Sequence, residues 1–146
     1  MASIDNFEEV RLYNHLKTSG LTAGFTDVYG NAQPAPKIFI SEYDDTDLDA
    51  NERALLFRLL GDDQIGDNAN GITEFPCLIN VFSKNDKQDS GVARGYAEDI
   101  SKWLKDNFFS DNECILSIQT RNVSGPFYGG ESRREYTINL IVRFYG

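Results

Sequence analysis

The chain ends in an eleven-residue run, EYTINLIVRFY at positions 135–145, in which every second side chain is apolar. This run constrains the fold more than any other part of the sequence. Because successive side chains of a strand point to opposite faces, the period predicts a β-strand with one buried face. The expected buried face consists of Tyr136, Ile138, Leu140, Val142 and Phe144.

Two earlier runs alternate in the same way, FPCLINVF at 75–82 and CILSIQTRNV at 114–123, and they predict two more strands. Between them, residues 92–109 repeat apolar side chains at spacings of three and four, which predicts an amphipathic helix of about five turns. Asp89 or Ser90 can cap its start.

The N-terminal half gives weaker periodic signals. Residues 3–18 predict a helix with Ser3 as its N-cap and Gly20 as its stop. Residues 20–36 carry three glycines and two prolines and predict an irregular connection, whereas KIFISEY at 37–43 predicts a short strand.

Residues 49–60, DANERALLFRLL, support two interpretations. Asp49 followed by Glu52 resembles a capping box, and the local composition favours a helix. The short apolar run, closed by Gly61, is equally typical of a strand buried on both faces. The residues alone leave this choice open.

The order of these elements predicts an α+β fold, since runs of strands and helices do not alternate regularly. The expected sheet is mainly antiparallel, with four to five strands and with helices packed on one face. A chain of 146 residues with 40% hydrophobic content fits one domain, residues 1–146, with a sizeable core.

The formal net charge of −9 is concentrated in residues 42–74, which hold ten acids and two bases. The acids are Glu42, Asp44, Asp45, Asp47, Asp49, Glu52, Asp62, Asp63, Asp67 and Glu74, and the bases are Arg53 and Arg58. Without a large basic face, tight binding to nucleic acid is not expected. No apolar run approaches the roughly 20 residues of a membrane span, so we expect a soluble, unexported protein with no membrane partner.

Neither a metal site nor a catalytic site is indicated. Cys77, Cys114 and the lone His15 are too few and too far apart for zinc, and no nucleophile motif accompanies the histidine. The run DDTDLD at 44–49 departs from a calcium loop, because Ala50 stands where glycine is required and Leu56 where glutamate is required. We therefore expect no cofactor, no metal and no enzymatic activity.

The stretch GPFYGGESRR at 125–134 has the glycines and arginines of a phosphate loop, but it precedes a strand. Phosphate loops place their glycines directly before a helix N-terminus, where free amides meet the anion. The stretch is better interpreted as a long hairpin loop that joins two antiparallel strands.

In its C-terminal half the chain resembles the tail terminator proteins of long-tailed bacteriophages, small α+β subunits that form a hexameric ring. FPCLINVFSKN is similar to the family's central strand, ARGYAEDISKWLKDNF to the long helix, and NVSGPFYGGESRREYTINLIVRFYG to the closing hairpin with its aromatic-glycine loop. The three pieces lie within residues 75–146, and the N-terminal half matches only in outline. The resemblance implies that residues 52–60 form a strand.

The resemblance also implies a function, that of a virion structural protein that caps the tail tube, stops its polymerisation and provides the head-attachment surface. The implied partners are further copies in a hexameric ring, the tail tube protein, and a head-tail connector or neck protein. DNA would pass through the lumen without specific binding. The implied location is the head-proximal end of the tail, after assembly in the host cytoplasm.

Two alternatives stay open. A phage neck or head-completion protein would dock on the portal side instead, and a non-viral module would use its acidic segment to bind a basic partner.

The residues expected to make protein contacts are aromatic and arginine side chains of the hairpin loop and aspartates of the acidic segment, types that interfaces use. They are Phe127, Tyr128, Arg133, Arg134, Asp44, Asp45, Asp47 and Asp49.

Overall fold

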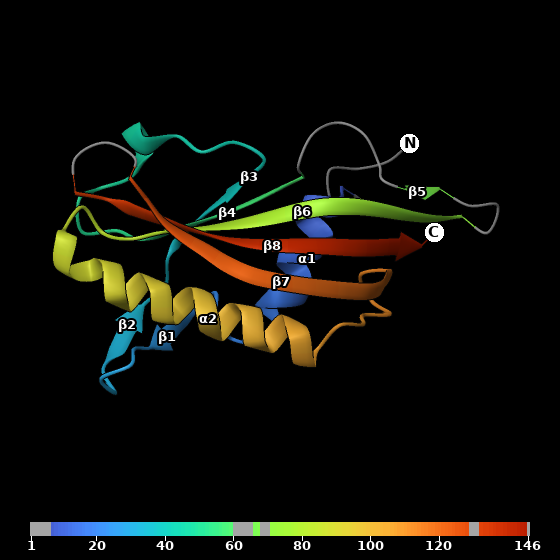
Figure 1. The fold of residues 1–146 in the computed structure, drawn as a ribbon, viewed down its shortest axis with the longest axis horizontal. Helices are drawn as coiled ribbons and strands as arrows, with labels where there is room; N and C mark the ends of the chain where they lie inside the picture. The colour runs from blue at the N-terminus through green and yellow to red at the C-terminus, as the bar shows by residue number, and fades with distance from the viewer. Residues whose placement is uncertain (1–6, 60–65, 68–70, 129–131, 146) are drawn as a thin grey trace.

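The fold is an α+β sandwich, seen in a computed structural model that describes residues 7–59, 66–67, 71–128 and 132–145 (Figure 1). The elements in chain order are α1 (Glu8–Lys17), β1 (Gly24–Thr26), β2 (Ala32–Pro34), β3 (Lys37–Ile40), η2 (Asp45–Asp47), β4 (Ala54–Leu59), β5 (Gly66–Asp67), β6 (Ile72–Phe82), η3 (Lys87–Asp89), α2 (Ser90–Asp106), β7 (Ile115–Tyr128) and β8 (Arg134–Tyr145).

The main sheet has the strand order β3-β4-β6-β8-β7, and the short β5 pairs with β6. β3 runs parallel to β4, and the other neighbouring strands of this sheet pair antiparallel. The mainly antiparallel α+β architecture expected from the sequence is confirmed. β3 and β7 are therefore the two edges of the sheet.

Both helices and the β1–β2 hairpin pack on one face of this sheet, which we call the helix face (Figure 1). Leu12 and Leu16 of α1 lie in the same apolar cluster as Ile100 and Leu104 of α2. The alternating side chains predicted to be buried on β8 all lie in this cluster, namely Tyr136, Ile138, Leu140, Val142 and Phe144. Alternation alone was enough to identify the buried face, because the opposite face of β8 has no helix above it.

β4 decides between the two interpretations of residues 49–60 in favour of a strand. Leu55 and Phe57 are buried on the helix face, while Ala54 and Leu56 are buried in a smaller cluster on the opposite face. The Asp49 amide does donate to Glu52 Oε1 at 3.0 Å, as a capping box requires, but no helix follows. Burial on both faces overrides the local helical preference.

The N-terminal boundaries differ from the sequence prediction. α1 begins at Glu8 after an extended Phe7, so the expected start at Ser3 is wrong, and Ser3 itself lies outside the described residues. The expected irregular connection at 20–36 is also wrong in part, since it contains the β1–β2 hairpin. That hairpin is stabilised by a tertiary contact, the stacking of Phe25 on Tyr96 of α2 at 3.8 Å between ring centroids.

The long hairpin loop expected at 125–134 is much shorter, because β7 and β8 pair as far as Tyr128 and Arg134. A register shift between Ser124 and Phe127 accommodates the extra residues as a bulge. Gly125 is needed there, since its φ is +134° and an added Cβ would lie 2.8 Å from the Glu135 carbonyl oxygen.

Candidate interaction surfaces

The acidic segment, residues 42–52, lies over the face of the sheet opposite the helices, which we call the open face. Leu48 is buried against the open-face cluster, and the Tyr43 ring stacks on Phe82 with centroids 4.2 Å apart. These apolar contacts fix the backbone of a segment whose remaining side chains are mostly acidic. The segment is thus a defined surface of the fold.

The four predicted aspartates of this segment have different roles. Asp44 accepts hydrogen bonds from the Thr46 hydroxyl at 2.6 Å and the Thr46 amide at 3.0 Å, and these bonds lower the pKa of the Asp44 carboxyl. Asp47 and Asp49 are exposed. The side chain of Asp45 lies outside the described residues. Asp44 therefore stabilises the local turn, and Asp47 and Asp49 present carboxylates to solvent.

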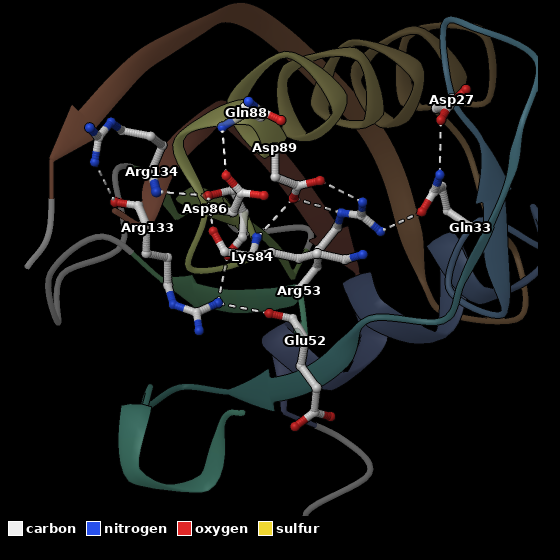
Figure 2. A network of polar contacts seen from close by, with 11 residues as sticks. Asp27, Gln33, Glu52, Arg53, Lys84, Asp86, Gln88, Asp89, Arg133 and Arg134 are labelled. Atoms are coloured by element: carbon white, nitrogen blue, oxygen red, sulfur yellow. Dashed lines mark hydrogen bonds and ion pairs between the residues drawn. The ribbon is translucent and has the colours of Figure 1, made fainter. Parts of the chain in front are cut away.

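Arg133 contacts the acidic segment through the backbone (Figure 2). Its Nη1 donates to the carbonyl oxygens of Glu52 at 2.7 Å and Ser83 at 2.5 Å, and its Nη2 donates to the Asp49 carbonyl at 3.1 Å. The two sets of predicted contact residues thus meet within one molecule. Arg133 is an internal clamp on the acidic segment, a role that the sequence did not indicate.

Arg134 and Tyr128 form a second pair at the end of the hairpin. The Arg134 guanidinium lies 4.4 Å from the centroid of the Tyr128 ring, and its backbone amide donates to Ser83 Oγ at 2.8 Å. Tyr128 is 74% exposed and Phe127 is 48% exposed. Both aromatic side chains are available for contact, as expected, although they lie on a strand and not on a loop.

A buried ion pair that the sequence did not indicate lies beside these contacts (Figure 2). Arg53 and Asp89 make two hydrogen bonds, Nη2 to Oδ1 at 2.6 Å and Nε to Oδ2 at 2.9 Å. Asp89 Oδ2 also accepts from the Lys84 amide at 2.8 Å. Asp89 occupies the N-cap position of α2, as one of the two predicted caps, but its side chain makes no cap bond there because Arg53 and Lys84 use it.

The same network continues into the β1–β2 hairpin. Arg53 Nη1 donates to Gln33 Oε1 at 3.0 Å, and Gln33 Nε2 donates to Asp27 Oδ2 at 2.8 Å. Asp27 Oδ1 accepts from the amides of Tyr29 and Asn31, both at 2.9 Å, which closes the hairpin turn. Hydrogen bonding, first of all from the Asn31 amide, lowers the pKa of Asp27.

A shallow groove crosses β4, β6, β8 and β7 on the open face. It consists of two hollows of about 470 and 330 Å³ that share Leu78, Ser124 and Asn139 as lining residues. Arg121 lines the first hollow, and Arg58, Phe127 and Glu135 line the second, so a predicted contact residue, Phe127, belongs to the groove. The sequence offered one signal for the groove, the polar side chains that alternate with the apolar face of each strand.

Arg58 is held in place by a row of polar side chains. Its Nε donates to Asn80 Oδ1 at 3.1 Å, and Asn80 Nδ2 donates to Thr137 Oγ1 at 3.0 Å. Asn80 and Thr137 are buried, so this row satisfies polar groups that would otherwise be costly to bury. The Arg58 guanidinium is consequently fixed at the groove wall.

Burial of Glu135 at the groove makes the stability of the fold depend on pH. Burial raises the pKa of this carboxyl, and the nearby positive charge of Arg58 offsets part of that rise. A raised folded-state pKa means that the ionised form destabilises the fold above that pKa, and that this cost disappears as the pH falls below the unfolded value.

We therefore expect Glu135→Gln to be more stable than the wild type at pH 7.5 and to lose that advantage by pH 4. Urea unfolding of both proteins at the two pH values measures the difference. An equal stability difference between the two proteins at both pH values would contradict a raised pKa of Glu135, since residue 135 is ionisable only in the wild type.

The remaining candidate groups are internal. His15 is buried, donates from Nε2 to the Asn107 carbonyl at 2.6 Å and lies against Trp103, as expected of a structural histidine. Cys77 and Cys114 are free thiols, and burial raises the pKa of Cys77 to about 12. Within the described residues, no three His, Cys, Asp or Glu side chains converge as a metal would require.

No model of a known protein family matches the chain, and no curated protein matches its sequence. In the described part of the chain, neither α1 nor α2 has the length and apolar content to cross a membrane.

Proposed function

We propose that this chain is a tail terminator, a virion structural protein that caps the tail tube of a long-tailed bacteriophage, stops its polymerisation and presents the head-attachment surface. The proposal is supported by the resemblance of residues 75–146 to that family. The order of strand, long helix and closing hairpin on which the resemblance rests agrees with β6, α2, β7 and β8.

The observation that carries the proposal is the pair of unlike surfaces on the open face. The acidic segment lies at the β3 side, where Leu48 clusters with Ala54 and Leu56 of β4, and the groove with its exposed Phe127 runs from Arg58 of β4 across β6 and β8 to β7. A subunit with two different surfaces at opposite edges can bind the next copy head to tail, which closes into a ring when the rotation allows. Binding a tube end and a connector needs further docking surfaces and no catalytic group.

The proposed partners are five further copies in a hexameric ring, the tail tube protein and a head-tail connector or neck protein. DNA passes through the lumen without specific binding, which suits a chain of net charge −9, because phosphates are repelled by carboxylates. The proposed location is the head-proximal end of the tail, reached after assembly in the host cytoplasm.

The test is to inactivate the gene in the phage that carries it and to image the products of infection by electron microscopy. A terminator predicts tubes that grow beyond their normal length and stay separate from filled heads. Complementation with the wild-type gene from a plasmid should restore both tail length and head attachment.

Other results would support the alternatives. Tubes of normal length beside unattached heads would favour a neck or head-completion protein. Normal, infectious particles would reject the virion role and favour an acidic protein-binding module.

A further inference from the structure

The groove on the open face of this acidic chain is lined by arginine side chains. Arg58, Arg121 and Arg143 point to this face, where they are accompanied by Glu74 and Glu135. The whole chain has a net charge of −9. An excess of arginine here is therefore a local reversal of charge, and arginine is the cation that interfaces favour.

Two of these arginines can bind a carboxylate of another molecule. Arg58 and Arg121 are exposed, and no ion pair among the described residues involves either of them. Arg143 pairs with Glu74 at 3.3 Å, an exposed contact that contributes little. Because Asn80 already fixes Arg58, little side-chain freedom is lost when a carboxylate binds it.

The acidic segment of a second copy supplies the matching charge. Glu42, Asp47 and Asp49 are exposed, and none of the ion pairs among the described residues involves them. Arg133 holds the backbone of this segment at two carbonyl oxygens and Leu48 anchors it to the sheet. Because this row of carboxylates is already held in place, little conformational entropy is lost when it binds.

Both surfaces lie on the open face, but among the described residues no ion pair joins them within one molecule. The acidic segment follows β3 at one edge, and Arg121 lies on β7 at the other edge. Contact between unlike surfaces at opposite edges repeats from copy to copy in one direction, as a ring requires.

We propose that the acidic segment of one copy docks in the open-face groove of the next copy, with its carboxylates against Arg58 and Arg121. This inference rests on the proposed ring and names the interface that forms it. Phe127 lines the same groove and supplies apolar contact area beside the charge pairs.

The test is a charge swap between the two surfaces. The segment variant carries Asp47→Lys and Asp49→Lys, which leaves the Asp44 turn intact, and the groove variant carries Arg58→Glu and Arg121→Glu. Sedimentation velocity and native mass spectrometry measure association, and circular dichroism checks the fold. Arg121→Glu alone serves as a second groove variant, since Arg58 also bonds Asn80.

Each variant alone should associate at least about tenfold more weakly than the wild type, because like charges then face each other across every interface. An equimolar mixture should regain association, because in an alternating ring every basic segment meets an acidic groove and the reverse. Such rings contain an even number of subunits, which native mass spectrometry resolves. The control Glu98→Lys with Asp106→Lys makes the same charge change as the segment variant, but on the exposed side of α2, and should associate like the wild type.

Three results would overturn the docking. Variants that associate like the wild type would exclude these surfaces while leaving the ring itself intact. Weakened variants that do not recover in the mixture would exclude their pairing. A wild-type chain that stays monomeric at every concentration, and also on tube ends, would overturn the ring and this interface together.

Discussion

Replacing Asp89 by alanine should lower the free energy of unfolding by about 3–5 kcal/mol, the usual cost of leaving one member of a buried ion pair without its partner. The side chains of Arg53 and Asp89 are only 4% and 7% exposed. Without the carboxylate, the Arg53 guanidinium would retain Gln33 as its remaining bond, and the Lys84 amide would lose its acceptor. Water cannot readily replace these bonds at such burial.

Urea unfolding followed by circular dichroism measures this loss. The matched control is Glu98→Ala, which removes the exposed pair between Arg94 and Glu98 at 4.0 Å and should change the free energy of unfolding by less than about 1 kcal/mol. An Asp89→Ala protein as stable as the control would mean that the buried pair contributes no more than a surface pair.

Asp89→Ala should also weaken the hydrogen bonds of the β1–β2 hairpin. Arg53 connects Asp89 to Gln33, and Gln33 connects to the Asp27 turn. Amide hydrogen exchange at Tyr29 and Asn31, whose amides donate to Asp27, should therefore become faster in Asp89→Ala even below the unfolding transition.

The parts of this fold that the sequence predicted are those in which local periodicity and burial agree. Every second residue of β8 is buried on the helix face, and the apolar positions of α2 follow the helical spacing. β4 shows the limit of that reasoning, because its composition favours a helix and its position between β3 and β6 makes it a strand. Only the family resemblance indicated the strand beforehand.

The contacts that the sequence did not predict join residues far apart in the chain. Arg133 bonds to carbonyl oxygens 81 and 50 positions earlier, and Arg53 pairs with a carboxylate 36 positions later. No periodic pattern carries such information, because any of several arginines and aspartates could have formed these pairs. Residue type identified the exposed aromatics Phe127 and Tyr128, but it could not distinguish the clamp Arg133 from its neighbour Arg134.

Replacing Arg133 by alanine should therefore lower the free energy of unfolding by about 2–3 kcal/mol, since hydrogen bonds from a charged donor each contribute about 1.5–3 kcal/mol and part of that loss is recovered by water. Its three acceptors, the carbonyls of Asp49, Glu52 and Ser83, lie in two different loops. Arg133→Lys should recover only part of the loss, because an ammonium group does not reproduce the planar fork that spans these oxygens.

Arg143→Ala is the control for Arg133→Ala, because it removes an arginine whose ion pair with Glu74 is exposed, and it should cost less than about 1 kcal/mol. The two roles considered for Arg133 predict different results. If Arg133 is an internal clamp, Arg133→Ala lowers the stability of the isolated subunit and weakens association only as far as the acidic segment is displaced. If Arg133 is instead a contact residue, Arg133→Ala leaves the urea midpoint unchanged and weakens association directly. An Arg133→Ala protein of wild-type stability that no longer associates would therefore show that Arg133 is an interface residue.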